Sequence, residues 1–287
     1  MSNPQWLDRQ AYPFQSHYFQ HPDGQIHYLD QGQGTPIVLV HGTPTWSYMF
    51  RHLIAPLSEN HRVLAIDHLG FGLSAKPKTA DYSVQAQAQR FSDWIASLNL
   101  TAFHLVVHDF GGPIALNYAL QHPQQIKSLT ISNSWMWSAR GEAQFEKLAK
   151  TLASPILPLL YRWFNFSARF LLPQGFAQRK HLSKPIHRQY LAPFRLGERE
   201  GPLGLAHSLL EAQDWFESLW EQREQLLPIQ TQILWGTQDK FLPSSYAERF
   251  ASIWPEPTKI VRFEEAGHFL WEEVHAEILV AIEDFIE

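Results

Sequence analysis

The sequence predicts an α/β protein with a mostly parallel, doubly wound sheet of eight strands that is interrupted by a helical cap. Three observations predict it. Short, nearly continuous apolar runs recur along the chain, longer segments with helical periodicity separate them, and this alternation fails over residues 135–213. Strands that helices cover on both faces are apolar on both faces, so continuous apolar runs favour a parallel sheet.

The expected strands follow in chain order. Residues 16–31 contain two strand-like runs around a turn at 22–24, which is typical of an antiparallel hairpin at a sheet edge. Six buried strands are expected after the hairpin, at 36–40 (PIVLV), 62–66 (RVLAI), 103–107 (FHLVV), 127–131 (KSLTI), 231–235 (TQILW) and 259–263 (KIVRF).

Helices are expected between these strands. One follows Ser83, where apolar residues recur at helical spacing as far as Leu98. Another opens at Gly111 and stops before Pro123, because proline cannot continue a helix. Residues 274–285 show the last helical pattern. The stretch 135–213 is helical in pattern, rich in aromatic residues and punctuated by prolines, so we expect core residues 1–134, a cap at 135–213 and core residues 214–287.

Composition narrows the classes of function. The chain has 287 residues, a formal net charge of -5 and no cysteine, which excludes disulfides, thiolate metal sites and a cysteine nucleophile. The charge balance predicts neither nucleic acid nor a membrane surface as partner. Residues 1–14 lack the apolar core of a signal peptide, and prolines and arginines interrupt the apolar stretch 155–172. We expect a cytoplasmic monomer or homodimer that uses no cofactor and no metal.

The segment LVVHDFGG at 105–112 carries the main chemical signal. A buried strand leads directly into a helix, with Asp109 at the junction and two glycines after it, which is the pattern of a nucleophile elbow. Aspartate also caps helices, so this position alone leaves a structural role open. At such an elbow the backbone N–H groups of Thr43, after an earlier strand, and of Phe110 are expected to form an oxyanion hole.

The partners of Asp109 are expected in the order nucleophile, acid, histidine. Asp239 follows the strand that ends at Trp235, and His268 follows the next strand. Because catalytic groups of parallel sheets gather at the carboxyl ends of the strands, these three segments can converge. His41 lies in the wrong place to be the base, and we interpret it as structural.

Four motifs give the chain a family resemblance. They are HGTPTWSY at 41–48, DHLGFGLSAKP at 67–77, VHDFGG at 107–112 and AGHF at 266–269. With them the chain resembles the haloalkane dehalogenases of the α/β-hydrolase superfamily, and next the epoxide hydrolases and fluoroacetate dehalogenase, from about Tyr12 to the C-terminus. Val107, where epoxide hydrolases typically have glycine, and the cap segment 190–194 (YLAPF) favour the dehalogenases.

The resemblance implies a hydrolytic dehalogenase that acts on small apolar haloalkanes through an alkyl-aspartyl ester. At two positions, however, the chain differs from the family it resembles. Phe110 stands where the family has a tryptophan that holds the halide, and Thr43 stands where it commonly has asparagine or glutamate. Since phenylalanine has no side-chain donor, the Thr43 hydroxyl and the cap indole of Trp163 become the candidate halide donors, with Phe110 in the wall.

Three alternatives stay open. An epoxide hydrolase would use the same residues with Tyr161 or Tyr190 as the acid on the epoxide oxygen. A related hydrolase would open a strained lactone, for which the family has precedent in β-lactone decarboxylases. A hydrolase-like receptor would bind a ligand without turnover.

Overall fold

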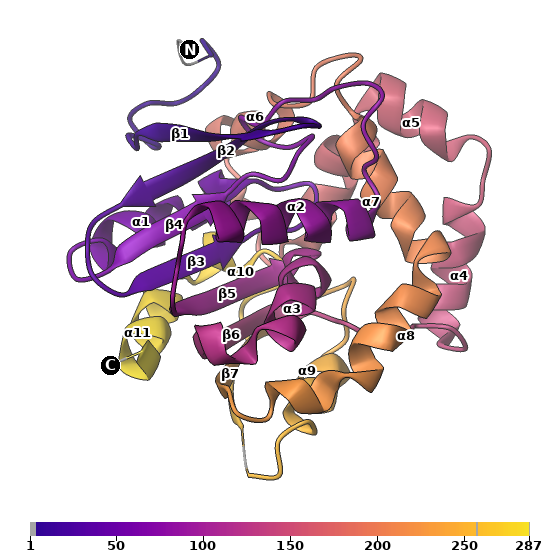
Figure 1. The fold of residues 1–287 in the computed structure, drawn as a ribbon. Helices are drawn as coiled ribbons and strands as arrows, with labels where there is room; N and C mark the ends of the chain where they lie inside the picture. Colours follow the sequence, from indigo (N-terminus) through magenta and orange to yellow (C-terminus); the bar gives the residue numbers. More distant parts are fainter. Residues whose placement is uncertain (1–3, 257, 287) are drawn as a thin grey trace.

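The computed structural model describes residues 4–256 and 258–286. Eight strands form one sheet in the order β1-β2-β4-β3-β5-β6-β7-β8 (Figure 1). Strands β1 and β2 form the predicted hairpin, β2 pairs antiparallel with β4, and every pair from β4 to β8 is parallel. The strands are β1 Ser16–His21, β2 Gly24–Gln31, β3 Pro36–Val40, β4 Arg62–Ile66, β5 Phe103–Asp109, β6 Ile126–Ser134, β7 Gln230–Gly236 and β8 Lys259–Phe263.

The eight-stranded, mostly parallel sheet is therefore confirmed, and the apolar runs explain why it forms. Side chains of one strand alternate between two buried clusters on opposite faces. On β3, Val38 and Val40 pack with the cluster that includes Phe91 of α2. Ile37 and Leu39 pack with the cluster that includes Ile278 of α11. A strand buried on both faces is therefore expected to be apolar at most of its positions.

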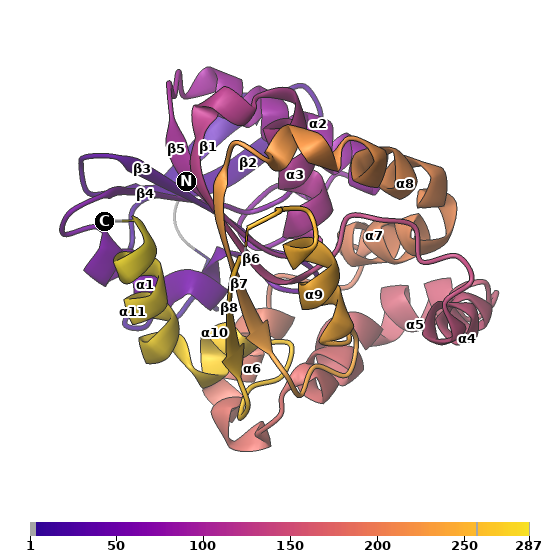
Figure 2. The ribbon, with the colours of Figure 1, turned by 90° about the horizontal axis from the view of Figure 1, so that it is seen from below.

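Helices cover both faces of the sheet (Figures 1 and 2). Helices α2 Val84–Ser97 and α3 Gly111–Gln121 contact each other, and α1 Arg51–Leu57 contacts α11 His275–Ile286. The hydroxyl oxygen of Ser83 accepts a hydrogen bond from the N–H of Ala86, so it caps α2 where the sequence predicts its start. The remaining core helices are α9 Ser245–Ala251 and α10 Leu270–Glu273, with 3-10 turns at Ser47–Phe50, Pro123–Gln125 and Arg223–Leu226.

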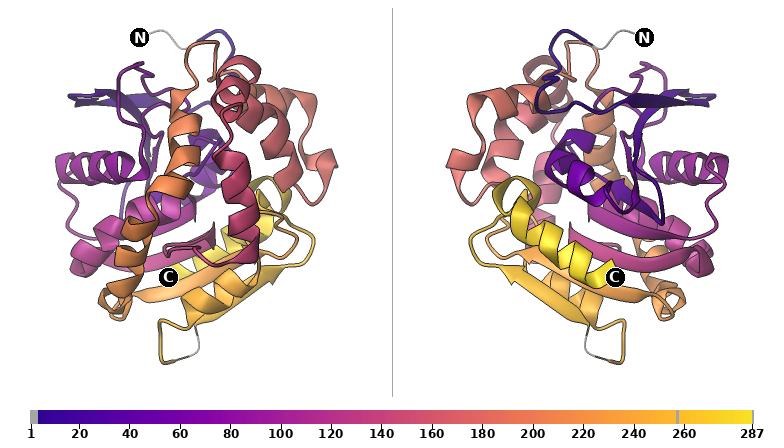
Figure 3. Two further views of the ribbon diagram at one scale, coloured as in Figure 1. Left: turned by 90° about the vertical axis from the view of Figure 1, so that its right-hand side faces the viewer. Right: turned by 90° about the vertical axis from the view of Figure 1, so that its left-hand side faces the viewer.

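The cap is built from the helices between β6 and β7, and it stands beside the carboxyl ends of the parallel strands (Figures 2 and 3). Its helices are α4 Ala143–Leu152, α5 Leu157–Phe164, α6 Lys184–Leu191 and α7 Glu200–Glu211, with short turns at Ser167–Leu171, Leu172–Gly175 and Arg179–His181. Helix α8 Gln213–Glu221 follows them and contacts the core helix α3. The boundaries 135 and 213 stay a prediction. Within the described residues, none of the helices has both the length and the apolar character needed to cross a membrane.

Candidate active site

The turn between β5 and α3 presents Asp109. Its φ of 51° lies in the left-handed region, which lifts the side chain out of the line of the strand. The hydroxyl of Ser134 donates to the carbonyl oxygen of Asp109 at 2.7 Å and holds the turn from β6. A Cβ at Gly111 would lie 2.3 Å from the carbonyl oxygen of Val40, so only glycine lets the helix begin this close to β3. The elbow predicted from the sequence is present.

The loop after β3 closes around the Asp109 carboxylate. The backbone N–H of Thr43 donates to Oδ1 of Asp109 at 2.7 Å. A Cβ at Gly42 would lie 2.0 Å from the same oxygen, so any larger residue there would displace the carboxylate. Thr43 therefore occupies the position expected for one oxyanion-hole donor. The backbone N–H of Phe110, the second expected donor, stays a prediction.

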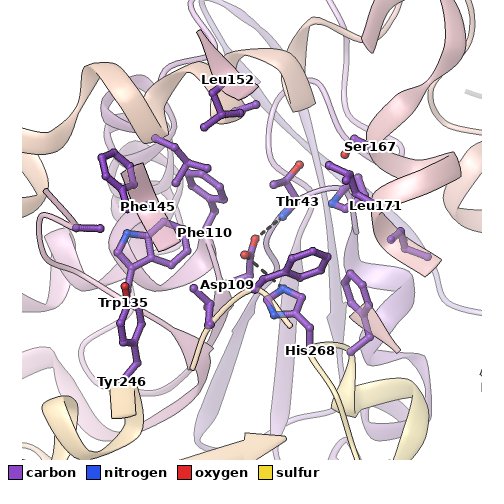
Figure 4. Close-up of a pocket in the computed structure, with 18 of the residues that line it drawn as sticks. Thr43, Asp109, Phe110, Trp135, Phe145, Leu152, Ser167, Leu171, Tyr246 and His268 are labelled. Carbon is purple, nitrogen blue, oxygen red and sulfur yellow. Dashed lines mark hydrogen bonds and ion pairs between the residues drawn. The ribbon is translucent and has the colours of Figure 1, made fainter. Parts of the chain in front are cut away.

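The loops after β7 and β8 bring Asp239 and His268 to the same place. Nδ1 of His268 lies 2.7 Å from Oδ2 of Asp239, and Nε2 lies 3.4 Å from Oδ2 of Asp109. Oδ1 of Asp239 accepts from the backbone N–H groups of Phe241 and Leu242 at 2.7 and 3.1 Å. The three side chains that sequence order suggested thus form a continuous acid–imidazole–acid chain (Figure 4).

The electrostatics of His268 follow from this chain. Burial lowers the pKa of the imidazole, but the charge of Asp239 and the hydrogen bond to Asp109 outweigh it and raise the pKa from 6.5 to about 10. The imidazole is therefore protonated at neutral pH. It can act as a base near neutral pH only when one of the interactions that raise its pKa is removed.

Asn133, at the end of β6, is a site residue that the sequence analysis missed. Its amide Nδ2 donates to Oδ2 of Asp239 at 2.7 Å, and its Oδ1 accepts from the backbone N–H of Gly236 at 2.9 Å. Its φ of 33° is one that asparagine tolerates better than most residues. The signal was available, because Asn133 ends a strand at the same sheet edge as Asp109 and Asp239.

Comparisons with known proteins agree with this geometry. Residues 35–273 match the family described as alpha/beta hydrolase fold. Haloalkane dehalogenase 2 of Mycobacterium tuberculosis is 30% identical over 277 residues, which cover 96% of each chain. The chain belongs to the haloalkane dehalogenase family of the α/β hydrolases.

Two further proteins are similar to the chain, one in sequence and one in structure. Cis-3-alkyl-4-alkyloxetan-2-one decarboxylase of Shewanella oneidensis is 30% identical over 284 residues, covering 96% of this chain and 89% of its own length. The crystal structure of haloalkane dehalogenase DbeA from Bradyrhizobium elkani superposes with a TM-score of 0.84 at 20% identity, covering 95% of this chain and 97% of that one. At that identity the superposition speaks for the fold alone.

A cavity of about 240 Å³ lies between the cap and the core of this dehalogenase-family protein, and Asp109 and His268 face it (Figure 4). Its wall is mostly apolar, as expected for a site that takes small apolar molecules. Residues of the core and of the cap line it together: Thr43, Pro44, Asp109, Phe110, Trp135, Ala139, Glu142, Phe145, Leu152, Tyr161, Ser167, Leu171, Leu172, Ala206, Leu209, Gln213, Phe241, Leu242, Tyr246, His268 and Phe269.

Two of the three residues considered for halide binding, Thr43 and Phe110, lie in the cavity wall. The Oγ1 atom of Thr43 is buried and has no hydrogen-bond partner among the described residues. A buried hydroxyl without a partner costs free energy, so this one is available to a ligand. Phe110 is also in the wall and packs edge-on against Trp135, with ring centroids 4.8 Å apart.

The third halide candidate, Trp163, was wrong. It lies on the outer surface of the cap with 62% of its surface exposed, while the cavity is lined by other residues. The spacing of apolar residues predicts a helix at α5, but both of its faces carry apolar side chains. The spacing therefore does not tell which face lines the cavity. The inner face carries Tyr161, and Trp163 is two residues further along the helix and faces outward.

Of the two tyrosines proposed as acids for an epoxide, one lines the cavity and the other does not. Tyr161 is buried and lines the cavity, as an acid for an epoxide oxygen would. Tyr190 is buried elsewhere, and its hydroxyl donates to Glu272, which pairs with Arg51 at 2.5 and 2.7 Å. Tyr190 therefore belongs to a buried ion-pair network, and its candidacy was wrong.

His41 has the structural role expected of it. Its Nδ1 lies 2.6 Å from the carbonyl oxygen of Gly42, and its Nε2 accepts from the backbone N–H of His68 at 3.0 Å. Burial lowers the pKa of His41, so the ring is neutral at pH 7. It ties together the loops that follow β3 and β4.

Proposed function

We propose that this protein hydrolyses small haloalkanes to an alcohol and a halide ion, with Asp109 as nucleophile, His268 as base and Asp239 as the acid that orients His268. One observation carries the proposal. A carboxylate, rather than a hydroxyl, stands at the elbow, with Oδ1 bonded to the Thr43 N–H and Oδ2 facing His268.

In the first step Oδ2 of Asp109 attacks the carbon that bears the halogen. A C–O bond forms, the carbon–halogen bond breaks, and the halide leaves with the bonding pair. The product on the enzyme is an alkyl ester, which water can hydrolyse. A serine in this position would form an ether, which water does not cleave under these conditions, and this explains why the elbow carries aspartate.

In the second step His268 takes a proton from a water molecule that attacks Cγ of the ester. Negative charge develops on Oδ1, which the N–H of Thr43 already contacts at 2.7 Å. Collapse of the intermediate breaks the Cγ–Oδ2 bond, and the alcohol leaves with Oδ2 and with the proton held by His268. Asp109 keeps the oxygen of the water molecule and becomes a carboxylate again when its remaining proton passes to solvent. The ester has no charge, so the interactions with Asp109 that help raise the pKa of His268 are absent at this stage. The first step therefore prepares the base for the second.

The leaving group would be held by the hydroxyl of Thr43. This side chain lies beside the nucleophile, and its Oγ1 is buried with no hydrogen bond among the described residues. Phe110 offers only an apolar ring at the position where relatives have a donor. With one donor fewer, the departing halide ion is stabilised less. Bromide and iodide need less of this stabilisation than chloride does, so chloroalkanes should react more slowly than bromoalkanes or iodoalkanes.

Two other activities are supported by specific observations. The oxetanone decarboxylase of Shewanella oneidensis is as similar in identity as the dehalogenase, which supports a strained lactone as substrate. Tyr161 in the cavity wall supports an epoxide, whose oxygen needs a proton. The experiment is to offer a bromoalkane, styrene oxide and a β-lactone and to measure halide, diol and alkene. Halide release alone supports the dehalogenase, and diol or alkene without halide overturns it.

The partners are a small apolar organic molecule and water. A monomer or homodimer in the cytoplasm remains the proposal for its assembly and location, and size-exclusion chromatography with light scattering measures the first of these.

A further inference from the structure

The outer face of the cap is apolar to an unusual degree. Nine large hydrophobic residues are strongly exposed in the described part of the chain, and six of them lie between residues 156 and 196. Each of these six has at least 46% of its surface exposed. They are Ile156, Leu159, Trp163, Phe164, Phe170 and Leu196, called the cap patch below.

Three segments carry the cap patch, and contacts hold these segments next to one another. Ile156, Leu159 and Trp163 follow one another at helical spacing along the outer face of α5. The ring of Phe170 lies 5.7 Å from the ring of Phe166, which in turn lies 6.0 Å from Tyr161 on the inner face of α5. The guanidinium of Arg199 donates to the carbonyl oxygen of Arg162 at 2.7 Å and so holds the loop that carries Leu196 against α5.

The same segment is strongly basic. Residues 156–199 contain eight lysines and arginines and one acidic residue, a formal charge of +7 in a chain whose total is -5. Arg169 and Arg195 are exposed beside the cap patch, and Arg162, also exposed, pairs with Glu200. The net charge of the whole chain is negative, and from it we expected no membrane partner. It does not show that positive charge is concentrated in this segment.

We propose that the cap patch docks on an anionic lipid surface. Tryptophan, phenylalanine and leucine on one face of a helix, flanked by arginines, are the combination by which a helix lies in the interface of a bilayer without crossing it. A second copy of this chain is a poorer occupant, because a symmetric contact would bring the same arginines against each other. Helix α5 stands at the outer rim of the cap, away from the sheet, where a flat surface can reach it (Figure 1).

The position of α5 gives this docking a consequence for substrate access. Tyr161 lies on the inner face of the helix and lines the cavity, whereas Trp163 lies on the outer face. One helix thus separates the cavity from the proposed lipid surface. Apolar molecules concentrate in lipid, so docking would place the cavity beside its richest supply of substrate. The docking itself does not depend on which substrate the enzyme turns over.

Sedimentation with vesicles tests the proposal without any substrate. The wild-type protein should sediment with vesicles of phosphatidylcholine mixed with phosphatidylglycerol at low salt, and much less with phosphatidylcholine alone or at high salt. The variant Leu159→Ser/Phe164→Ser should bind the anionic vesicles at least about tenfold more weakly. The matched control Leu227→Ser/Val280→Ser removes two exposed apolar residues outside the cap and should bind as the wild type does.

Three outcomes would overturn it: no sedimentation with anionic vesicles at low salt, equal binding by the cap variant, or a concentration-dependent dimer that the cap variant abolishes. The third result, measured by sedimentation velocity, would assign the patch to a second copy of the chain.

Discussion

The amide nitrogen of Asn133 lies 2.7 Å from Oδ2 of Asp239, the same carboxylate oxygen that accepts from Nδ1 of His268. The amide therefore fixes the orientation of the acid that fixes the imidazole. A hydrogen bond to a charged group contributes about 1.5–3 kcal/mol.

We expect Asn133→Gly to lower steady-state turnover about 10- to 100-fold. Glycine tolerates the backbone φ of 33°, so the loss reports the missing amide rather than backbone strain. The measurement is steady-state kinetics beside a thermal unfolding curve. Near-native turnover in a folded variant would show that the backbone N–H groups of Phe241 and Leu242 hold Asp239 without help.

The His268→Ala variant should accumulate the ester on Asp109. The first step does not need the imidazole, but the second does, because in the proposed mechanism His268 is the group that activates the water. Intact-protein mass spectrometry after addition of a bromoalkane should show an increase equal to the alkyl group. Peptide mapping should place it on Asp109, and His268→Ala/Asp109→Asn should remain unmodified. An adduct in that double variant would refute Asp109 as nucleophile.

The raised pKa of His268 predicts how stability depends on pH. The pKa is about 10 in the folded protein and 6.5 in the reference state, so the fold holds this proton more tightly. Its contribution to the free energy of unfolding is complete below pH 6.5 and is lost as the pH rises toward 10. Asp109→Asn removes one carboxylate that raises the pKa, so its stability should fall less over that interval.

Urea unfolding of the two proteins at both ends of the interval measures this difference, and NMR titration of the His268 ring measures the pKa directly. An identical pKa in wild type and Asp109→Asn would contradict the idea that esterification of Asp109 frees the base.

Thr43→Val should change the preference for the leaving group. Valine has the shape of threonine and keeps the backbone N–H that contacts Asp109, so only the hydroxyl is lost. A donor to developing negative charge is worth about 10²–10³ in rate. Chloride release should therefore fall more than bromide or iodide release. Thr43→Ser, which keeps the hydroxyl, is the control, and an unchanged chloride-to-bromide ratio in Thr43→Val would exclude this hydroxyl as donor.

Phe110→Trp should have the opposite effect, because it places an indole N–H where relatives have one. The phenyl ring is 2% exposed and packs against Trp135, so the larger ring must enter the cavity. We expect kcat/KM for chloroalkanes to rise up to about 100-fold relative to bromoalkanes. Phe145→Trp adds an indole to the same cavity wall and should leave the ratio unchanged. An equal change in both variants would mean that cavity shape, not the donor, decides.

The sequence was sufficient to predict the sheet and the three facing side chains. Strands buried on both faces leave an apolar run, and β3 is apolar from Pro36 to Val40 and buried from Ile37 onward. Asp109 ends one strand, Asp239 and His268 each follow another, and parallel strands bring their carboxyl ends to one edge.

The cap could not be predicted in the same detail. The outward position of Trp163 depends on how α5 packs on its neighbours, and periodicity does not encode that. The partner of Tyr190 is Glu272, which is 82 residues away in sequence. Asn133 could have been predicted, because it lies near the carboxyl end of β6, at the same sheet edge as Asp109 and Asp239.

The chain leaves the sheet after β6 and returns to it at β7, and these two strands are direct neighbours. The register of every strand is therefore independent of what lies between those two points. Loops on the core side hold the reacting carboxylate and the imidazole, while the helices between β6 and β7 supply much of the remaining cavity wall. An exchange of helices there would change which molecules enter, but it would have to keep one contact with the reacting groups, because the carbonyl oxygen of Gly175 in this stretch accepts from the backbone N–H of His268 at 2.8 Å. New substrates can therefore be acquired by altering these helices as long as the turn around Gly175 stays in place.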